Sequence, residues 1–379
     1  MNTTFMGTWA ANLIFFAQGF FFVLPGALTP VLSEYFGESL SAVGYCLSLS
    51  VIMRIVGNFF TGRNFTSIRL HKFVTRTNIA LVILLLMPLF VPNLGMFALA
   101  NLSAALFLGT HFAIGNNLIL YLYDDNKRTS QMAFLNFFYS AGAIVSPLVL
   151  SWFLGQNIHW AWIFAVCAVL TTGALLARKT DESAFYRPEE SKSERDFESN
   201  FHIQLTYVIM LIYVIAETMY ASWLPVFFIE QLHLSLADAA FTLVILWGGF
   251  AVGRFSCGFL SRTTIGYRLV VYLAGLTLLG MALLLLGLSW VDYRISTFIL
   301  GLGFSGMYAN ILAYGNSHLD RPNVKLMTIM TCLGTAGVIL GMVFASFLKE
   351  YMPTYPIMLI ATALFISSML MLRFSITKR

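Results

Sequence analysis

The chain has 379 residues, of which 59% are hydrophobic, 15% are aromatic and only 10% are charged. Soluble domains carry about 25% charged residues, so this composition excludes an ordinary soluble protein and predicts one that crosses a membrane repeatedly. The formal net charge of +5 is explained by basic residues at the inner membrane surface. We therefore expect the lipid bilayer, and no nucleic acid, as a partner.

Apolar runs long enough to cross a bilayer as helices, about 17–25 residues, recur along the whole chain. The opening run lacks a basic region and a small-residue cleavage site, so we expect an uncleaved first helix and no signal peptide. The pattern predicts an all-α polytopic membrane protein with twelve transmembrane helices, at residues 8–30, 42–61, 73–91, 94–121, 132–154, 158–176, 205–229, 239–260, 269–290, 295–313, 326–348 and 355–372.

A charged segment divides these runs into two groups of six. Residues 178–202 carry both signs of charge, which predicts a cytoplasmic linker between an N-terminal six-helix bundle (residues 1–177) and a C-terminal one (residues 203–379). If the N-terminus is inside, only Arg294 and Lys349 of the 22 lysines and arginines fall in outer loops. By the positive-inside rule we expect both termini in the cytoplasm, with the protein in a bacterial inner membrane.

Short motifs recur between the two halves at a nearly constant spacing. Two pairs differ by 200 in numbering and a third by 195: Leu24-Pro25 and Leu224-Pro225, Gly115-Asn116 and Gly315-Asn316, and Ala141-Gly142 and Ala336-Gly337. This spacing favours an internal duplication. Parallel repeats of six helices build the major facilitator fold, in which ligands bind near the bilayer midplane where the repeats meet.

Glu217 is the one acidic residue that falls deep inside a long apolar run. An ionised side chain at bilayer depth costs at least about 2.5–3.5 kcal/mol and usually faces a pathway, not lipid. Glu217 lies about 18 Å into its helix and shares one face with Tyr213 and Tyr220. We interpret it as the proton-coupling residue. The alternative is a neutral carboxyl group that only ties two helices together.

Other polar side chains are predicted at a similar depth and are candidates for contact with substrate. Asn, Gln and His in membrane helices often only hold helices together, which is the alternative for each of them. His111 is also the competing candidate for proton coupling, because an imidazole titrates near neutral pH. The substrate-binding candidates are Asn12, Gln18, Arg54, His111, Asn116, Asn136, Tyr139, Tyr213, Tyr220, Tyr308 and Asn310.

Two arginines lie inside apolar runs. Arg54 lies about 18 Å into its helix, and its planar fork suits a carboxylate or a phosphate. The alternative for Arg54 is an ion pair with Glu217 that opens and closes during transport. Arg254 is expected towards the cytoplasmic end of its helix, as a structural charge that holds helices and loops together. The recurrence of Ser39-Leu40 as Ser235-Leu236 pairs Arg254 with Asn58, so the two arginines are not repeat equivalents.

Several motifs carry a resemblance to a known family: YVIAET at 213–218, GRF at 253–255 with Arg262 downstream, GMYANILAYG at 306–315 and, more loosely, AGAIVSP at 141–147 and residues 109–117. They resemble the fucose:proton symporter branch of the major facilitator superfamily, including its TsgA-type members. The resemblance implies a twelve-helix secondary transporter. It also implies acids where this chain has Phe21 and Phe112, and Gln where it has Glu217, which weakens the assignment of fucose.

No nucleotide-binding signature is found. Gly301, Gly303 and Gly306 form a GxGxxG pattern inside an apolar run with no preceding strand, so we interpret them, like the series at 334, 337 and 341, as helix-packing glycines. The four cysteines show no metal-ligand spacing. We expect no cofactor, no metal and no enzymatic activity.

These observations predict a monomeric secondary transporter that moves a small polar or anionic organic solute by alternating access, coupled to protons. The solute is expected to be a sugar, a sugar acid or a carboxylate. One alternative is an exporter of a drug-like or siderophore-like compound, and another is a non-transporting sensor on the same fold. Buried charges favour transport, since a scaffold does not require them.

Overall fold

The computed structural model describes residues 3–65, 69–123, 125–180, 201–260, 266–287, 292–316 and 324–377. Every regular element within these ranges is helical. In this described part of the chain, twelve stretches of helix are long and apolar enough to cross a membrane, which confirms the predicted all-α fold. Most of the expected linker, residues 181–200, lies outside the described ranges, as does Arg262.

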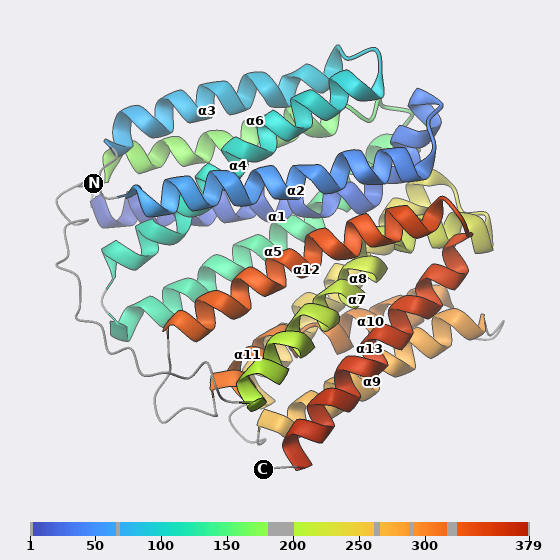
Figure 1. The fold of residues 1–379 in the computed structure, drawn as a ribbon. Coiled ribbons are helices and arrows are strands. Elements are labelled where there is room, and N and C mark those ends of the chain that lie inside the picture. The colour runs from blue at the N-terminus through green and yellow to red at the C-terminus, as the bar shows by residue number, and fades with distance from the viewer. Residues whose placement is uncertain are drawn as a thin grey trace. The chain divides into compact units, whose positions relative to one another are not determined.

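The chain divides into two compact units, Met1–Ser191 and Lys192–Arg379, and the α-helices of both are labelled in Figure 1. The elements of the first unit are α1 (Thr3–Phe36), α2 (Leu40–Arg63), α3 (Leu70–Leu86), the 3₁₀ helix η2 (Met87–Leu89), α4 (Leu94–Leu122), α5 (Asp125–Gly155), α6 (Trp162–Thr171) and the 3₁₀ helix η3 (Thr172–Lys179). Those of the second unit are α7 (Phe201–Leu232), α8 (Leu236–Leu260), α9 (Gly266–Leu286), α10 (Tyr293–Phe304), α11 (Met307–Asn316), α12 (Val324–Lys349) and α13 (Thr354–Thr377).

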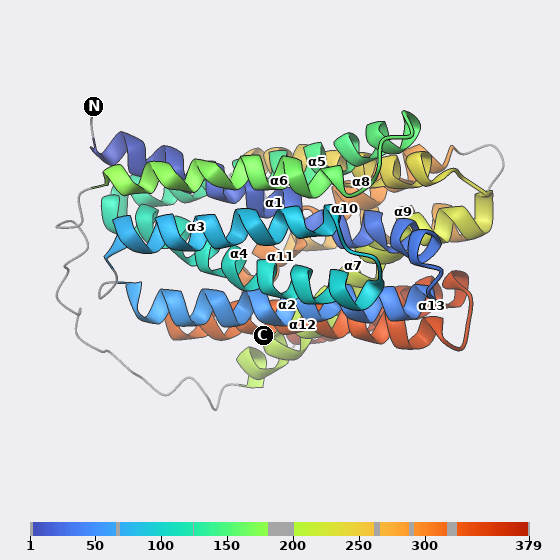
Figure 2. The same ribbon diagram turned by 90° about the horizontal axis from the view of Figure 1, so that it is seen from above.

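Glycines bring helices of the first unit into close contact. α1 packs against α5, and both views show the helices of this unit running side by side (Figures 1 and 2). Gly19 of α1 lies against the Tyr139 carbonyl of α5, and Gly142 of α5 lies against the Phe16 carbonyl of α1. A Cβ atom at either glycine would overlap with that carbonyl oxygen, so the close approach requires glycine.

The second unit repeats these contacts. Gly337 on α12, which the repeated Ala-Gly motif pairs with Gly142, lies against Val214 of α7. Gly253 on α8 packs against the residue that follows α10, and its counterpart in the first repeat, Gly57, packs against α4. These equivalent contacts agree with the duplication inferred from the sequence. Gly57 and Gly253 differ by 196 in numbering, the same offset that pairs Asn58, and not Arg54, with Arg254.

The tenth apolar run is interrupted, whereas the sequence predicted one continuous helix at 295–313. α10 ends at Phe304, and α11 begins at Met307 after a turn at Ser305 and Gly306. The Ser305 hydroxyl donates to the Leu302 carbonyl at 2.7 Å. Such bonds from a side chain to its own helix bend helices, and glycine is a poor helix former, which explains the interruption.

The sixth run begins later than the predicted residue 158 and ends as a tighter helix. Asn157 has a φ of 55°, the left-handed conformation that follows the end of α5 and delays α6. The hydroxyls of Thr171 and Thr172 donate to carbonyls three residues earlier, at 2.8 and 2.6 Å. The chain then continues as η3, which ends at Arg178 and Lys179.

A polar clamp joins three helices of the second unit. Glu230, near the end of α7, pairs with Lys349 at the end of α12 and accepts a hydrogen bond from the Thr354 amide at 2.8 Å, at the start of α13. The side chains of Lys349 and Glu230 are 12% and 24% exposed. The carboxylate therefore satisfies both a basic side chain and the amino end of a helix, where negative charge is favourable.

Two further contacts join α7 to α13 along their length. The Tyr220 hydroxyl lies 2.6 Å from the Thr362 hydroxyl. Nearer the start of α7, His202 Nδ1 lies 3.0 Å from the Ser375 hydroxyl. With the Glu230 clamp, α7 and α13 are hydrogen-bonded at three levels.

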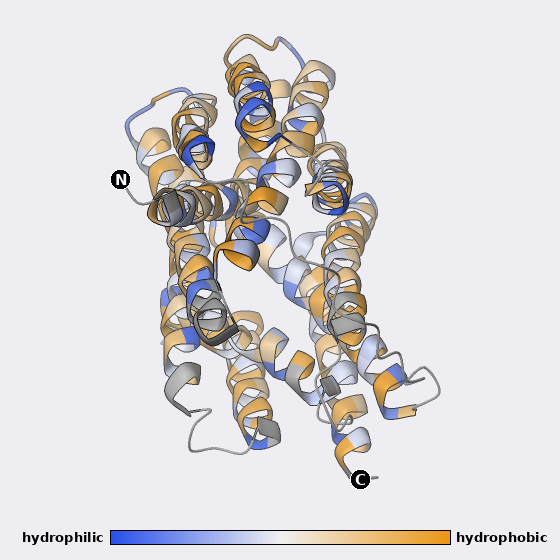
Figure 3. Cartoon of the chain, turned by 90° about the vertical axis from the view of Figure 1, so that its left-hand side faces the viewer, coloured by the Kyte–Doolittle hydropathy of each residue, from blue (hydrophilic) through white to orange (hydrophobic). Residues whose placement is uncertain are grey.

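Hydrophobic residues dominate the helices of both units (Figure 3). Large apolar side chains lie on the outside as well as in the core, including Leu99, Val169 and Leu370, which are 68%, 70% and 62% exposed. Such surfaces would be unfavourable in water and are suited to contact with lipid. This agrees with the assignment of the helices as membrane spans.

Candidate functional site

Arg54 of α2 lies against two aromatic rings of α1. Its guanidinium carbon is 5.5 Å from the ring centre of Phe21 and 5.6 Å from that of Phe22. Its Nε is buried and has no hydrogen-bond partner among the described residues. A cation–π contact is worth about 0.5–2 kcal/mol, but it satisfies none of the N–H donors. The guanidinium therefore retains capacity for an acceptor.

The backbone of Arg54 is fixed by glycine packing. Gly109 of α4 lies directly against the Arg54 carbonyl, and Gly57, one turn further along α2, lies against the Leu106 carbonyl of α4. Side chains at these positions would force the two helices apart. The glycines thus hold α2 on α4 at the level of Arg54.

Gln18 lies at the same level of the bundle. Its Nε2 donates to the Leu108 carbonyl at 2.7 Å, next to the glycine that contacts Arg54. Its Oε1 is buried without a hydrogen-bond partner among the described residues. Phe21 and Phe22 follow Gln18 by three and four residues, so all three lie on one face of α1. The Gln18 side chain and the Arg54 backbone thus contact adjacent residues of α4.

Tyr139 of α5 completes an aromatic wall. Its ring centre is 5.8 Å from that of Phe22 and 6.4 Å from that of Phe15, and Tyr139 interacts electrostatically with Arg54. Phe15 stacks on Phe112 at 4.8 Å. The two positions at which the resemblance implies acids, Phe21 and Phe112, are therefore both occupied by packed rings.

The remaining candidates of the first unit are engaged elsewhere or lie apart. His111 Nε2 is 3.2 Å from the Thr77 hydroxyl, which links α4 to α3. Asn116 donates to the Phe112 carbonyl of its own helix at 3.2 Å. Asn12 is buried, with no hydrogen-bond partner for its Oδ1 among the described residues, and Asn136 is exposed.

Glu217 of α7 forms a second polar centre, within the second unit. The Glu217 side chain interacts electrostatically with Arg254 of α8, with Tyr213 and with Tyr308 of α11. Tyr213 is fully buried, and its hydroxyl donates to the Phe304 carbonyl at 3.3 Å. The centre thus combines one acid, one base and two hydroxyls from three helices.

Arg254, which was expected to hold helices and loops together, also interacts with the acid of this centre. The guanidinium carbon lies 5.4 Å from the ring centre of Phe250, and Arg254 is an electrostatic partner of Glu217. Glu217 precedes the short connection between α7 and α8 by nearly as much as Arg254 follows it. Because the two helices are antiparallel neighbours, counting outward from that connection would have brought both residues to a similar depth.

The break between α10 and α11 positions Tyr308. This residue is the second of α11, its ring lies against Gly334 of α12, and its hydroxyl is hydrogen-bonded to Thr331. Asn310 donates to the Gly306 carbonyl at 2.7 Å, within the turn. Hydropathy alone gave no signal of this break or of Thr331.

Tyr220 was expected to contact the substrate on the same helix face as Glu217, but its hydroxyl is hydrogen-bonded to a neighbouring helix. Its hydroxyl lies 2.6 Å from the Thr362 hydroxyl and donates to the Met358 carbonyl at 3.3 Å, both on α13. It is 1% exposed. An ion pair between Arg54 and Glu217 stays a prediction, because these residues belong to different units.

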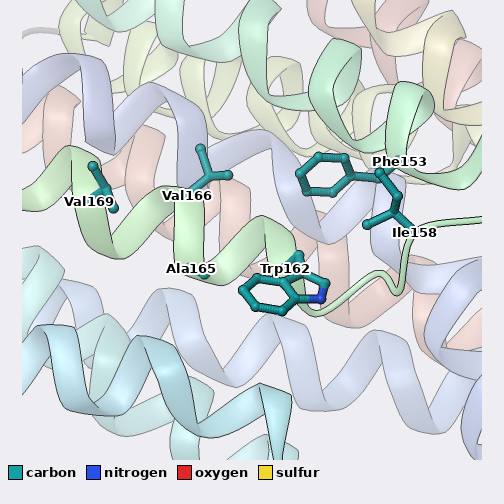
Figure 4. Close-up of a pocket in the computed structure, with 6 residues that line it drawn as sticks. All are labelled: Phe153, Ile158, Trp162, Ala165, Val166 and Val169. Carbon is teal, nitrogen blue, oxygen red and sulfur yellow. The ribbon is translucent and has the colours of Figure 1, made fainter. Parts of the chain in front are cut away.

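A groove elsewhere on the first unit is entirely apolar. It has a volume of about 350 Å³ and is lined by Phe153, Ile158, Trp162, Ala165, Val166 and Val169 (Figure 4). Trp162 and Val169 are 52% and 70% exposed, and these lining residues include none of the predicted site residues. The groove suits lipid chains and not a polar solute. Within the described ranges, no group of three or more His, Cys, Asp or Glu side chains could hold a metal.

Sequence comparisons find relatives along most of the chain. Protein TsgA of Shigella flexneri is 23% identical over 367 residues, which covers 94% of this chain and 91% of that protein. A TsgA homolog of Buchnera aphidicola subsp. Schizaphis graminum is 20% identical over 361 residues, which covers 95% of this chain and 93% of that protein. The TsgA-type resemblance carried by the motifs is thereby confirmed.

Solved structures show the same fold. A crystal structure of a mutant of the nucleoside transporter NupG gives a TM-score of 0.71 at 12% identity, covering 98% of this chain and all of that chain. A bacterial homolog of the human lysosomal transporter Spinster, inward-facing and unoccupied, gives 0.63 at 12% identity, covering 98% and 92%. A family model described as Major Facilitator Superfamily matches residues 10–324. With that match extending over most of its length, the chain belongs to the Major Facilitator Superfamily of transporters.

Proposed function

We propose that this protein is a secondary transporter of a small anionic organic solute, a sugar acid or another hydroxylated carboxylate, and that transport is coupled to protons. The observation that carries the proposal is the position of Arg54. A guanidinium that lies against the rings of Phe21 and Phe22, with its buried Nε unpartnered among the described residues, is suited to a carboxylate from the solute.

Charge and hydrogen bonding together suggest how such a solute is recognised. The fork of Arg54 would bind the carboxylate in a bidentate manner, which an ammonium group cannot do. The unpartnered Gln18 Oε1 would accept a hydrogen bond from a hydroxyl group of the same solute. The rings of Phe21 and Phe22 lie against the guanidinium and would lower the local polarity, which strengthens charge-assisted bonds.

The centre around Glu217 supports the proton-coupling part. Arg254 is an electrostatic partner of Glu217, so movement of Arg254 towards or away from the carboxyl group during transport would change how far the charged form is stabilised. The competing candidate, His111, is bonded to Thr77 between two helices. That contact is what a structural histidine would make, and it favours Glu217 as the proton carrier.

The proposal is tested by ligand binding to the purified protein. Sugars, sugar acids, carboxylates and chelators are screened by thermal shift, and the affinities of ligands that stabilise the protein are measured by calorimetry. Arg54→Gln should weaken binding of the anionic ligand by about 2–5 kcal/mol, the loss expected when one partner of a buried charge pair is removed. Arg54→Lys should restore only part of it, because the charge returns without the fork.

The matched control is Arg63→Gln, which removes an exposed arginine at the end of the same helix. It should bind as the wild type does. If Arg54→Gln binds the native solute with undiminished affinity, Arg54 is not in the site and a neutral sugar becomes the expected substrate.

A further inference from the structure

A second cavity lies where α3 begins and η3 ends. It has a volume of about 320 Å³ and is lined by His71, Leu175, Arg178 and Lys179. Arg178 Nη2 is 3.5 Å from His71 Nε2, and because a guanidinium only donates, that imidazole nitrogen acts as an acceptor in this long contact. The described residues that line the cavity include the two basic side chains Arg178 and Lys179 and no acidic one.

The start of α3 adds to this positive potential. Its N-cap residue, Arg69, makes no side-chain capping bond, so the first amides of the helix keep their partial positive charge. Lys72 and Arg76 are exposed on the same helix, close to His71. Basic side chains beside the amino end of a helix repel its dipole, and a bound anion would relieve this repulsion.

The position of the cavity indicates which anion fits. The membrane span of α3 begins at Leu70, and that of α6 and η3 ends at Lys179, so the cavity lies at the level of the lipid headgroups. Leu175 gives it one apolar wall, and α6 exposes Val169 further along the same span. We propose that this cavity binds the phosphate of an anionic membrane lipid, whose acyl chains lie against the exposed surface of α6.

The test is lipid binding to the full-length protein, measured by native mass spectrometry with phosphatidylglycerol or phosphatidylcholine added in detergent. The double variant Arg178→Gln/Lys179→Gln should lose about fivefold in phosphatidylglycerol affinity per charge, or about thirtyfold in all, which corresponds to about 1 kcal/mol per basic residue. Phosphatidylcholine binding should not change. Arg373→Gln, which removes an exposed arginine near the end of α13, is the matched control and should bind as the wild type does.

A second measurement needs only the wild type. Raising the salt concentration should weaken binding of phosphatidylglycerol and leave that of phosphatidylcholine unchanged. Equal phosphatidylglycerol affinity in the double variant and the wild type would overturn the site. Inorganic phosphate that competes as strongly as the lipid, at equal concentration, would overturn the lipid assignment in favour of a soluble phosphate.

Discussion

The guanidinium carbon of Arg54 lies 5.5 Å from the ring centre of Phe21, and Phe21 stands where the resemblance to sugar symporters implies an acid. An acid at this position would lie next to the guanidinium and neutralise it from within the bundle. The aromatic ring instead holds the cation without supplying a counter-charge. The proposed function assigns that counter-charge to a carboxylate of the solute.

This relationship predicts the effect of restoring the acid. In Phe21→Asp, the new carboxylate should pair with Arg54 and occupy the place of the solute anion. Binding of the anionic ligand, measured by calorimetry, should fall at least as far as in Arg54→Gln. Phe21→Leu removes the ring without adding charge and should cost less. Equal losses in the two Phe21 variants would show that the ring, and not the charge balance, governs binding.

Transport measurements in proteoliposomes can distinguish whether Glu217 or His111 carries the coupling proton. Glu217→Gln should bind solute and exchange it between equal pools, but should not accumulate it when a pH gradient is imposed, because the amide cannot take up and release a proton. Glutamine is also the residue that the resemblance implies at this position, so the variant should fold. His111→Asn should keep most of the gradient-driven accumulation. Uptake still driven by the gradient in Glu217→Gln would make the assignment wrong.

The clamp formed by Glu230 predicts that removing the charge of this residue lowers the stability of the protein. Glu230→Gln should weaken the contacts to Lys349 and to the Thr354 amide, at a cost of about 1.5–3 kcal/mol for hydrogen bonds to a charged group. The midpoint of thermal unfolding should fall. Glu34→Gln, at an exposed acid of α1, is the control and should leave it unchanged. Lys349→Gln and the double variant complete a cycle, and strictly additive losses would contradict a coupled clamp.

The distribution of basic residues predicts the topology. A reporter fused after Arg379 should be active in the cytoplasm, and one inserted near Glu34 should be active on the outer side. These two fusions lie at the end of the chain and after the first span. A C-terminal reporter active outside would contradict the predicted orientation.

Much of the fold could be predicted because the bilayer requires long apolar helices, which are visible as apolar runs in the sequence. Twelve apolar runs of spanning length were visible in the sequence, and the glycine contacts at Gly142 and Gly337 match the spacing of the repeat. The break at Ser305 and Gly306 was not predicted, because hydropathy averages over a window and does not register one turn. The tight end of the sixth span was missed for the same reason.

Less of the candidate site could be predicted. Depth along a helix follows from counting residues, and it selected Arg54 and Glu217 as charges within apolar spans. It does not say which face meets which neighbour, so the rings beside Arg54, the bond from His111 to Thr77 and the bond from Tyr220 to Thr362 became visible only in three dimensions. The approach of Arg254 to Glu217 could have been inferred from the short connection between their helices.

The three contacts between α7 and α13 have a mechanical consequence for Glu217. Because α7 is hydrogen-bonded to α13 at His202, Tyr220 and Glu230, we expect the two helices to move together as one rigid pair. Glu217 lies on α7 between the outermost of these contacts, those at His202 and Glu230. Any change in its surroundings must then come from the movement of other parts towards or away from it, above all the helices that bear Arg254 and Tyr308.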